Sequence, residues 1–183
     1  MYLLMFIREW IKALYGVDAL CELSKRFTIA ARQLGLRHVP RIFDVKHGSI
    51  TGLHYRALIQ VVAVITHDYI PADSPMGCVI AATVDWYWAC RASTFTVADI
   101  ASLQEKCTTL GEAWAELDTV EWRATLGTVK DKKFPKACVL LTNKFHRALR
   151  HCADYVREWG PMEYITTETS EALHKPLKEF FRT

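Results

Sequence analysis

The segment Leu141-Thr-Asn-Lys-Phe-His-Arg-Ala-Leu-Arg-His-Cys-Ala-Asp-Tyr-Val-Arg-Glu-Trp-Gly160 shows most clearly how this chain folds. Its apolar side chains recur at steps of three and four residues, at Leu141, Phe145, Leu149, Cys152, Val156 and Trp159. That spacing places them along one stripe of an α-helix. Gly160 and Pro161 then end the helix. We therefore predict one amphipathic helix that starts after Pro135 and stops at Gly160.

The same spacing predicts two helices in the N-terminal part of the chain. Apolar residues with helical spacing run from Leu3 to Leu14, and Gly16 ends this helix because glycine tolerates left-handed geometry. A second helix is expected over Asp18–Leu34, with the aspartate as a plausible N-cap.

Two further helices have recognisable start signals. Ser74 is placed to cap a helix whose first turn contains Pro75. Thr96 and Asp99 are three residues apart, as in a capping box, and predict the start of another. Between these helices and the N-terminal pair, the hydrophobic residues after Thr51 predict a helix that ends before Pro71.

The fold class follows from this series of elements. No two segments with strand periodicity are separated by a recognisable turn signal, and no internal repeat is visible. We therefore expect an all-α protein, an irregular bundle of about seven helices that forms a single domain over residues 1–183.

The composition indicates a folded protein whose hydrophobic core can stabilise it without bound metals or disulfides. The 183 residues are 51% hydrophobic and 23% charged, which is typical of a globular domain. The six cysteines include no C-x-x-C pair, so we expect reduced and mostly buried thiols. The most apolar region is interrupted by Gln60, His67 and Asp85, so we expect no membrane partner. The apolar N-terminal stretch from Met1 to Ile7 is too short for a secretory signal and has no positive leader, so we expect an intracellular protein.

Positive charge is concentrated around the C-terminal amphipathic helix. The net charge is only +3, but residues 130–157 contain eight Lys or Arg and two acids. One interpretation is a DNA-binding surface, in which the cations neutralise phosphates; the candidates are Lys132, Lys133, Lys136, Lys144, Arg147, Arg150 and Arg157. The alternative is the ordinary solvated face of a helix.

A last helix is expected after Thr166 or Thr167, either of which can cap it. Glu168 and Glu171 lie three residues apart on one face near its start, and His174 follows one turn later. These carboxylates could be metal ligands or catalytic acids, with the histidine as a supporting group. They could equally stabilise the helix through its dipole, whatever the function.

Several motifs together resemble the C-terminal region of Plavaka-type transposases, which are CACTA-like elements of fungi. The block Gly48-Ser-Ile-Thr-Gly-Leu-His-Tyr-Arg56 and the aromatic-rich stretch from Trp86 to Leu110 are similar to the family pattern. The most specific match is the C-terminal block: Lys144-Phe-His146, Arg150-His151, Asp154-Tyr-Val-Arg157, Trp159-Gly160, Tyr164 and Thr167-Glu168-x-x-Glu171-x-x-His174. The chain looks like a truncated copy of such a protein.

The resemblance implies a particular ancestry for the site. Transposases of this class bind Mg²⁺ with three carboxylates, and Glu168 or Glu171 would correspond to the last of them. The other two acids come from an RNase H-like sheet, which we do not expect here. The isolated chain is therefore expected to be catalytically inactive and to hold no cofactor of its own. The resemblance further implies a nuclear protein whose partner is DNA, the missing catalytic core or another copy of itself.

Two other functions remain open from the residues alone. The first is a helical protein-interaction module, because Trp86, Tyr87 and Trp88 cannot all face one side of a helix and at least one ring must reach a surface. The second is a helical metal enzyme that uses His146 and His151 with the two glutamates. The five-residue spacing of the histidines places them on different helical faces, which argues against joint metal binding.

Overall fold

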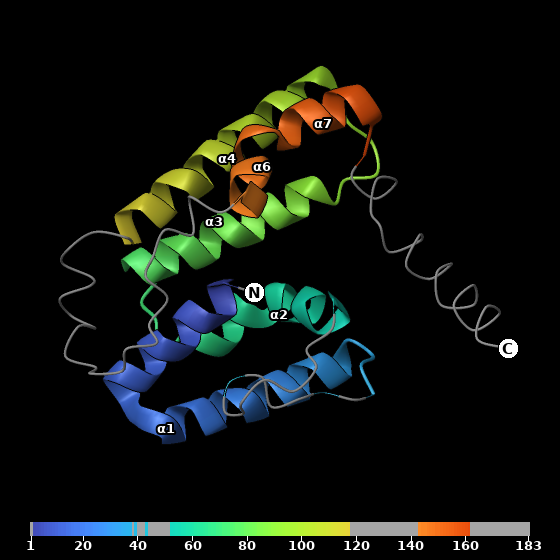
Figure 1. Ribbon diagram of the computed structural model, residues 1–183. Coiled ribbons are helices and arrows are strands. Elements are labelled where there is room, and N and C mark those ends of the chain that lie inside the picture. The colour runs from blue at the N-terminus through green and yellow to red at the C-terminus, as the bar shows by residue number, and fades with distance from the viewer. Residues whose placement is uncertain (1, 38, 40–42, 44–51, 118–142, 162–183) are drawn as a thin grey trace, which may run out of the picture.

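The computed structural model describes residues 2–37, 39, 43, 52–117 and 143–161. These residues form the helices α1 (Tyr2–Gln33), α2 (Gly52–Thr66), α3 (Pro75–Cys90), α4 (Val97–Leu117), α6 (Asn143–Arg150) and α7 (Cys152–Trp159) (Figure 1). No strand occurs in these ranges, so the all-α prediction is confirmed. The helix expected after Thr166 lies outside the described residues.

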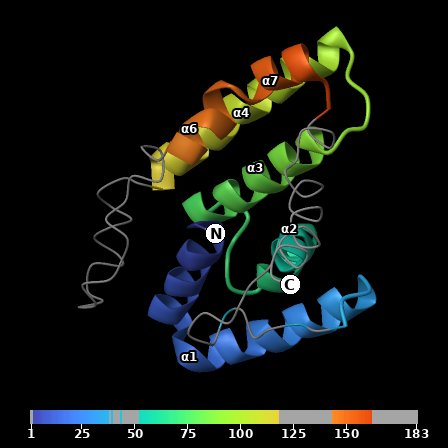
Figure 2. The ribbon, with the colours of Figure 1, turned by 45° about the vertical axis from the view of Figure 1, so that its right-hand side comes forward.

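The helices lie in three tiers. Helices α1 and α2 form one side, α3 lies in the middle, and α4 with α6 and α7 forms the other side (Figures 1 and 2). The main hydrophobic core joins α1 and α2 to α3 and α4, with Ile7, Leu23, Phe27, Val62, Met76 and Leu110 among its most buried members. A smaller cluster joins α3, α4 and α7, and contains Cys90, Leu103, Cys107, Cys152, Ala153 and Val156.

Helix α1 is interrupted at Gly16. The φ and ψ angles there are 80° and −173°, so two helical segments meet at a kink. A positive φ of this size is readily adopted only by glycine. The predicted end of one helix at Gly16 and the start of another near Asp18 are therefore confirmed.

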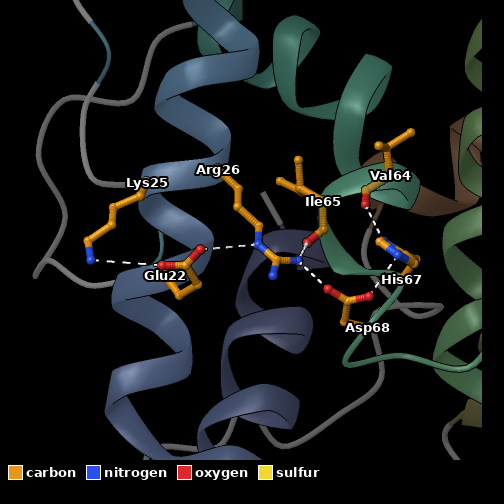
Figure 3. A network of polar contacts seen from close by, with 7 residues as sticks. All are labelled: Glu22, Lys25, Arg26, Val64, Ile65, His67 and Asp68. Carbon is orange, nitrogen blue, oxygen red and sulfur yellow. Dashed lines mark hydrogen bonds and ion pairs between the residues drawn. The ribbon is translucent and has the colours of Figure 1, made fainter.

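Helix α2 ends at Thr66, before Pro71 as predicted. The backbone N–H groups of Tyr69 and Ile70 both donate to the Thr66 carbonyl, at 2.9 Å each, and so form a turn. Arg26 of α1 reaches this end of α2 and donates from Nη1 to the Ile65 carbonyl at 3.4 Å (Figure 3). The arginine thus satisfies one of the carbonyls left free at a helix C-terminus.

Arg26 also links α1 to the turn after α2. Its Nη1 donates to Asp68 Oδ2 at 2.8 Å, and its Nε is 3.4 Å from Glu22 Oε1 (Figure 3). The guanidinium hydrogen bond holds the pKa of Asp68 below its usual value. Because this carboxyl ionises more readily in the folded chain, its contribution to stability is present above its unfolded pKa and is lost as the pH falls through the folded pKa.

Both predicted start signals in the middle of the chain are present. At α3, Ser74 Oγ accepts a hydrogen bond from the Gly77 N–H at 3.1 Å, and Pro75 occupies the first turn. Before α4, the Asp99 N–H donates to Thr96 Oγ1 at 3.2 Å, while the Thr96 N–H donates to Asp99 Oδ2 at 2.8 Å. This reciprocal pair is the predicted capping box. The two caps fix where α3 and α4 begin.

Candidate functional site on helices α4, α6 and α7

The predicted single amphipathic helix is two helices in the structure. His151 separates α6 from α7, with φ and ψ of −118° and −3°. The backbone hydrogen bonds continue around it, since the His151 N–H donates to Arg147 and the His151 carbonyl accepts from Tyr155. Gly160 ends α7 as predicted, with a φ of 82°.

The break changes which residues are buried. Cys152 and Val156 are buried as the stripe predicts, but Trp159 is 65% exposed. Ala153 is buried beside them, so the buried face of α7 is rotated away from Trp159, which is also the last residue of the helix. The prediction that Trp159 belongs to the buried stripe is therefore wrong.

The predicted cations are only partly within the described residues. Arg147 and Arg150 are exposed on α6, and they lie three residues apart, which places them side by side on the helix surface. Arg157 on α7 is also exposed, but it forms an ion pair with Asp154 at 2.6 Å. Lys144 lies in the first turn of α6, whereas Lys132, Lys133 and Lys136 lie outside the described part of the chain.

A groove of about 430 Å³ runs between α4 and α6. Its walls include Gln104, Cys107, Thr108, Gly111, Glu112, Ala115, His146, Leu149 and Arg150. Gly111 explains the close approach, because a Cβ atom there would lie 3.3 Å from the Leu149 Cδ1. The glycine that weakens the middle of α4 therefore makes room for α6. The groove has Arg150 and His146 on one helix and Glu112 on the other, so its charges are mixed.

The two histidines of this region are neighbours. The rings of His146 and His151 are 5.2 Å apart between centroids, and the Tyr155 ring is 6.2 Å from His151. The rings therefore meet even though the five-residue spacing places the two residues on different helical faces. Both side chains are exposed. Within the described ranges, no group of three or more His, Cys, Asp or Glu side chains could hold a metal ion.

Three thiols from three helices meet under α7. Cys90 Sγ of α3 lies 3.5 Å from Cys152 Sγ of α7, and Cys107 Sγ of α4 donates to the Ala148 carbonyl at 3.5 Å. All three residues are buried, as predicted, but the sequence did not indicate that they meet. We call Cys90, Cys107 and Cys152 the thiol cluster.

The surroundings of the thiol cluster disfavour thiolates. For Cys107, the hydrogen bond with Cys152 and then burial raise the pKa. For Cys152, the hydrogen bond with Cys107 lowers the pKa, but the one with Cys90 and burial outweigh it and raise the pKa to about 12. The buried Trp86 Nε1 makes no hydrogen bond within the described residues; its N–H group lowers the pKa of both thiols, but less than the other groups raise it.

The aromatic triplet of α3 divides as predicted between core and surface. Trp86 packs against both hydrophobic clusters, whereas Trp88 is 52% exposed and contacts Tyr87, with 5.5 Å between their centroids. The exposed Trp88 and Trp159 are the largest apolar side chains that this part of the molecule presents to solvent.

The predicted acidic site lies elsewhere in the chain. Glu168, Glu171 and His174 are outside the described residues, so the structure does not place them relative to the thiol cluster or the groove.

No protein-family model matches the chain, and searches of curated proteins and of solved structures found no similar protein. Across the helices described here, none is long and apolar enough to cross a membrane.

Proposed function

We propose that this chain is a transposase-derived, non-catalytic helical module that binds DNA through the cationic surface of α6. The observation that carries the proposal is the pair Arg147 and Arg150. Both are exposed, adjacent on one helix face, and without an ion-pair partner among the described residues. Two such guanidinium groups can each neutralise a phosphate of a nucleic acid backbone.

The charge around this pair favours backbone contact over base reading. Helix α6 contains no acidic residue, whereas α7 carries Asp154, which already holds Arg157. Glu112 lies across the groove from Arg150 and repels phosphate, so DNA would approach the exposed Arg147 and Arg150 from the solvent side and not enter the groove. Affinity from so few contacts should be modest and should depend strongly on salt.

The test is DNA binding measured by fluorescence anisotropy at several salt concentrations. The double variant R147A/R150A should weaken binding and lower the slope of log affinity against log salt by about 2, because each phosphate contact contributes about 0.9. The matched control is R32A/R37A, which removes the same charge from two exposed positions, one in the last turn of α1 and one just after it. Equal effects of the two double variants would show that DNA binding depends on net charge alone, and would refute the assignment of the binding surface to α6.

The non-catalytic part of the proposal is tested separately. The family resemblance implies Mg²⁺ held by Glu168 or Glu171, but the described residues contribute no carboxylate set for it. No metal-dependent step is therefore proposed for the isolated chain. Incubation of the purified protein with supercoiled plasmid and Mg²⁺ should leave the plasmid intact. Nicking that is lost in E168Q or E171Q would overturn this part.

A protein-interaction module is the second candidate, and the exposed Trp88 and Trp159 favour it. Large aromatic side chains are enriched at the centres of protein interfaces. Sedimentation velocity over a range of concentrations tests the simplest partner, a second copy. Concentration-dependent association that W88A/W159A abolishes would support this candidate, and a monomer at every concentration would exclude self-association.

A further inference from the structure

The contact between Cys90 and Cys152 has consequences that do not depend on DNA binding. Their sulfur atoms are 3.5 Å apart although the residues are 62 positions apart in sequence. A disulfide needs about 2.0 Å between sulfurs, so the two atoms must approach by about 1.5 Å. We propose that Cys90 and Cys152 are an oxidisable pair, and that their disulfide fastens α7 to α3.

The reaction balances with a small-molecule disulfide as oxidant. The thiolate of Cys90, once its proton is lost, attacks one sulfur of the oxidant, forms a mixed disulfide and releases one small thiolate, which takes up that proton. The sulfur of Cys152 then attacks Cys90 and releases the second small thiolate, which takes up a proton. Two protein thiols are oxidised and one oxidant disulfide is reduced to two thiols.

Access determines the order of attack. Cys90 is 8% exposed and Cys152 is 1% exposed, so the oxidant reaches Cys90 more easily. Cys90 also lies at the last position of α3, where the chain leaves the helix. Cys152 is held against Cys90 and needs only a short movement to displace the small thiol. The pair therefore favours the internal disulfide over a lasting mixed disulfide.

Burial makes the reaction slow at neutral pH. Only thiolates attack disulfides, and the environment of Cys152 opposes ionisation. As long as the pH is below the pKa of Cys152, the cross-linking rate should therefore increase about tenfold for each unit by which the pH is raised. The pair would respond to sustained oxidation and ignore brief exposure.

The disulfide would change what holds the smaller core together. In the reduced chain, α7 is held to α3 and α4 by the packing of Cys152, Ala153 and Val156. After oxidation, a covalent bond restrains the end of the segment that carries Arg147 and Arg150. We expect a higher midpoint of urea denaturation for the oxidised protein than for the reduced one.

The test uses the full chain in the background C21A/C78A/C138A, which keeps only the thiol cluster. After treatment with oxidised glutathione, peptide mapping by mass spectrometry without reduction should find Cys90 joined to Cys152. The variant C107A in this background should keep the cross-link, because Cys107 is not part of the pair. The variants C90A and C152A should each lose it.

Three results would overturn the proposal. They are a cross-link between Cys107 and Cys152 in place of the expected one, glutathione adducts without any internal disulfide, and unchanged thiols after prolonged oxidation at alkaline pH. Circular dichroism checks that each variant is folded. If C90A or C152A fails to fold, peptide mapping of the parent background still decides which thiols are joined.

Discussion

Gly77 and Gly111 both lie inside helices, but an added methyl group would meet different neighbours. At Gly77 of α3, a Cβ atom would clash with the Pro71 carbonyl oxygen and lie 2.7 Å from the Ala72 carbonyl oxygen. Backbone atoms in a tight turn cannot easily move away. At Gly111 of α4, the nearest atom is the end of the Leu149 side chain at 3.3 Å, which can rotate.

We therefore expect different changes in the free energy of unfolding for alanine at these two positions. G77A should lower the free energy of unfolding by about 1–3 kcal/mol, as overpacking does in well-packed cores. G111A should change it little, because a gain of about 0.5–1 kcal/mol in helix propensity offsets the displacement of Leu149. Urea denaturation of both variants measures the difference. Equal losses in the two would contradict this account of Gly77.

The residue-level features that could be predicted from the sequence are local ones. The Ser74 cap and the capping box of Thr96 and Asp99 depend on atoms three residues apart, so a short stretch of sequence contains the whole signal. The meeting of Cys90, Cys107 and Cys152 depends on how α3, α4 and α7 pack, and no spacing between these cysteines indicates it. The mutual approach of the thiols therefore emerged only from the structure.

Helices α6 and α7 show where periodicity misleads at the level of elements. Apolar residues recur without interruption across His151, so the sequence predicts one helix where the structure has two. The backbone hydrogen bonds on either side of His151 are retained, so the break is local, and the spacing of the apolar residues carries no sign of it. The exposure of Trp159 was missed for the same reason.

The packing of α3, α4 and α7 around the thiol cluster predicts loss of stability at alkaline pH. The pKa of Cys152 is raised from about 9 to about 12 in the folded chain, and that of Cys107 is raised as well. Above about pH 9 the unfolded chain releases these protons first. Stability should therefore be complete below about pH 9 and should fall as the pH rises from about 9 toward 12.

Urea denaturation between pH 8 and pH 10.5 under reducing conditions measures this slope. C152A should flatten it relative to the parent protein, even though the substitution also lowers stability at neutral pH. The control is C21A, which removes a half-buried thiol of α1 outside the cluster and should leave the slope unchanged. A C152A slope as steep as the parent's would mean that these thiols do not ionise on unfolding as described.

At the scale of the whole molecule, the two hydrophobic clusters differ in size and in the helices they join. The main core includes large side chains of α1, α2, α3 and α4, whereas α7 contributes only Cys152, Ala153 and Val156 to the smaller one. Helices α6 and α7 are each eight residues long, too short to be stable without such packing.

Hydrogen exchange should therefore distinguish two parts of the reduced protein. The amides of α6 and α7 should exchange faster than those of α3 and of the first half of α1, because less apolar surface is exposed when they open. Mass spectrometry of peptic fragments after timed labelling in reducing buffer gives both rates in one experiment. Uniform protection of all these helices would show that they unfold as one cooperative unit.

The kink at Gly16 also determines how the part of α1 before it is rotated about the helix axis relative to the part after it. At roughly 100° per residue, an uninterrupted helix would place Ile7 and Leu23 about 160° apart around its axis, on nearly opposite sides. Both are completely buried in the same core. The kink at Gly16 thus rotates one half of α1 relative to the other, so that the apolar side chains of both halves face the same core. A residue inserted elsewhere in α1 would rotate one apolar stripe outward, whereas the junction at Gly16 is the place where the chain can best absorb a change in length.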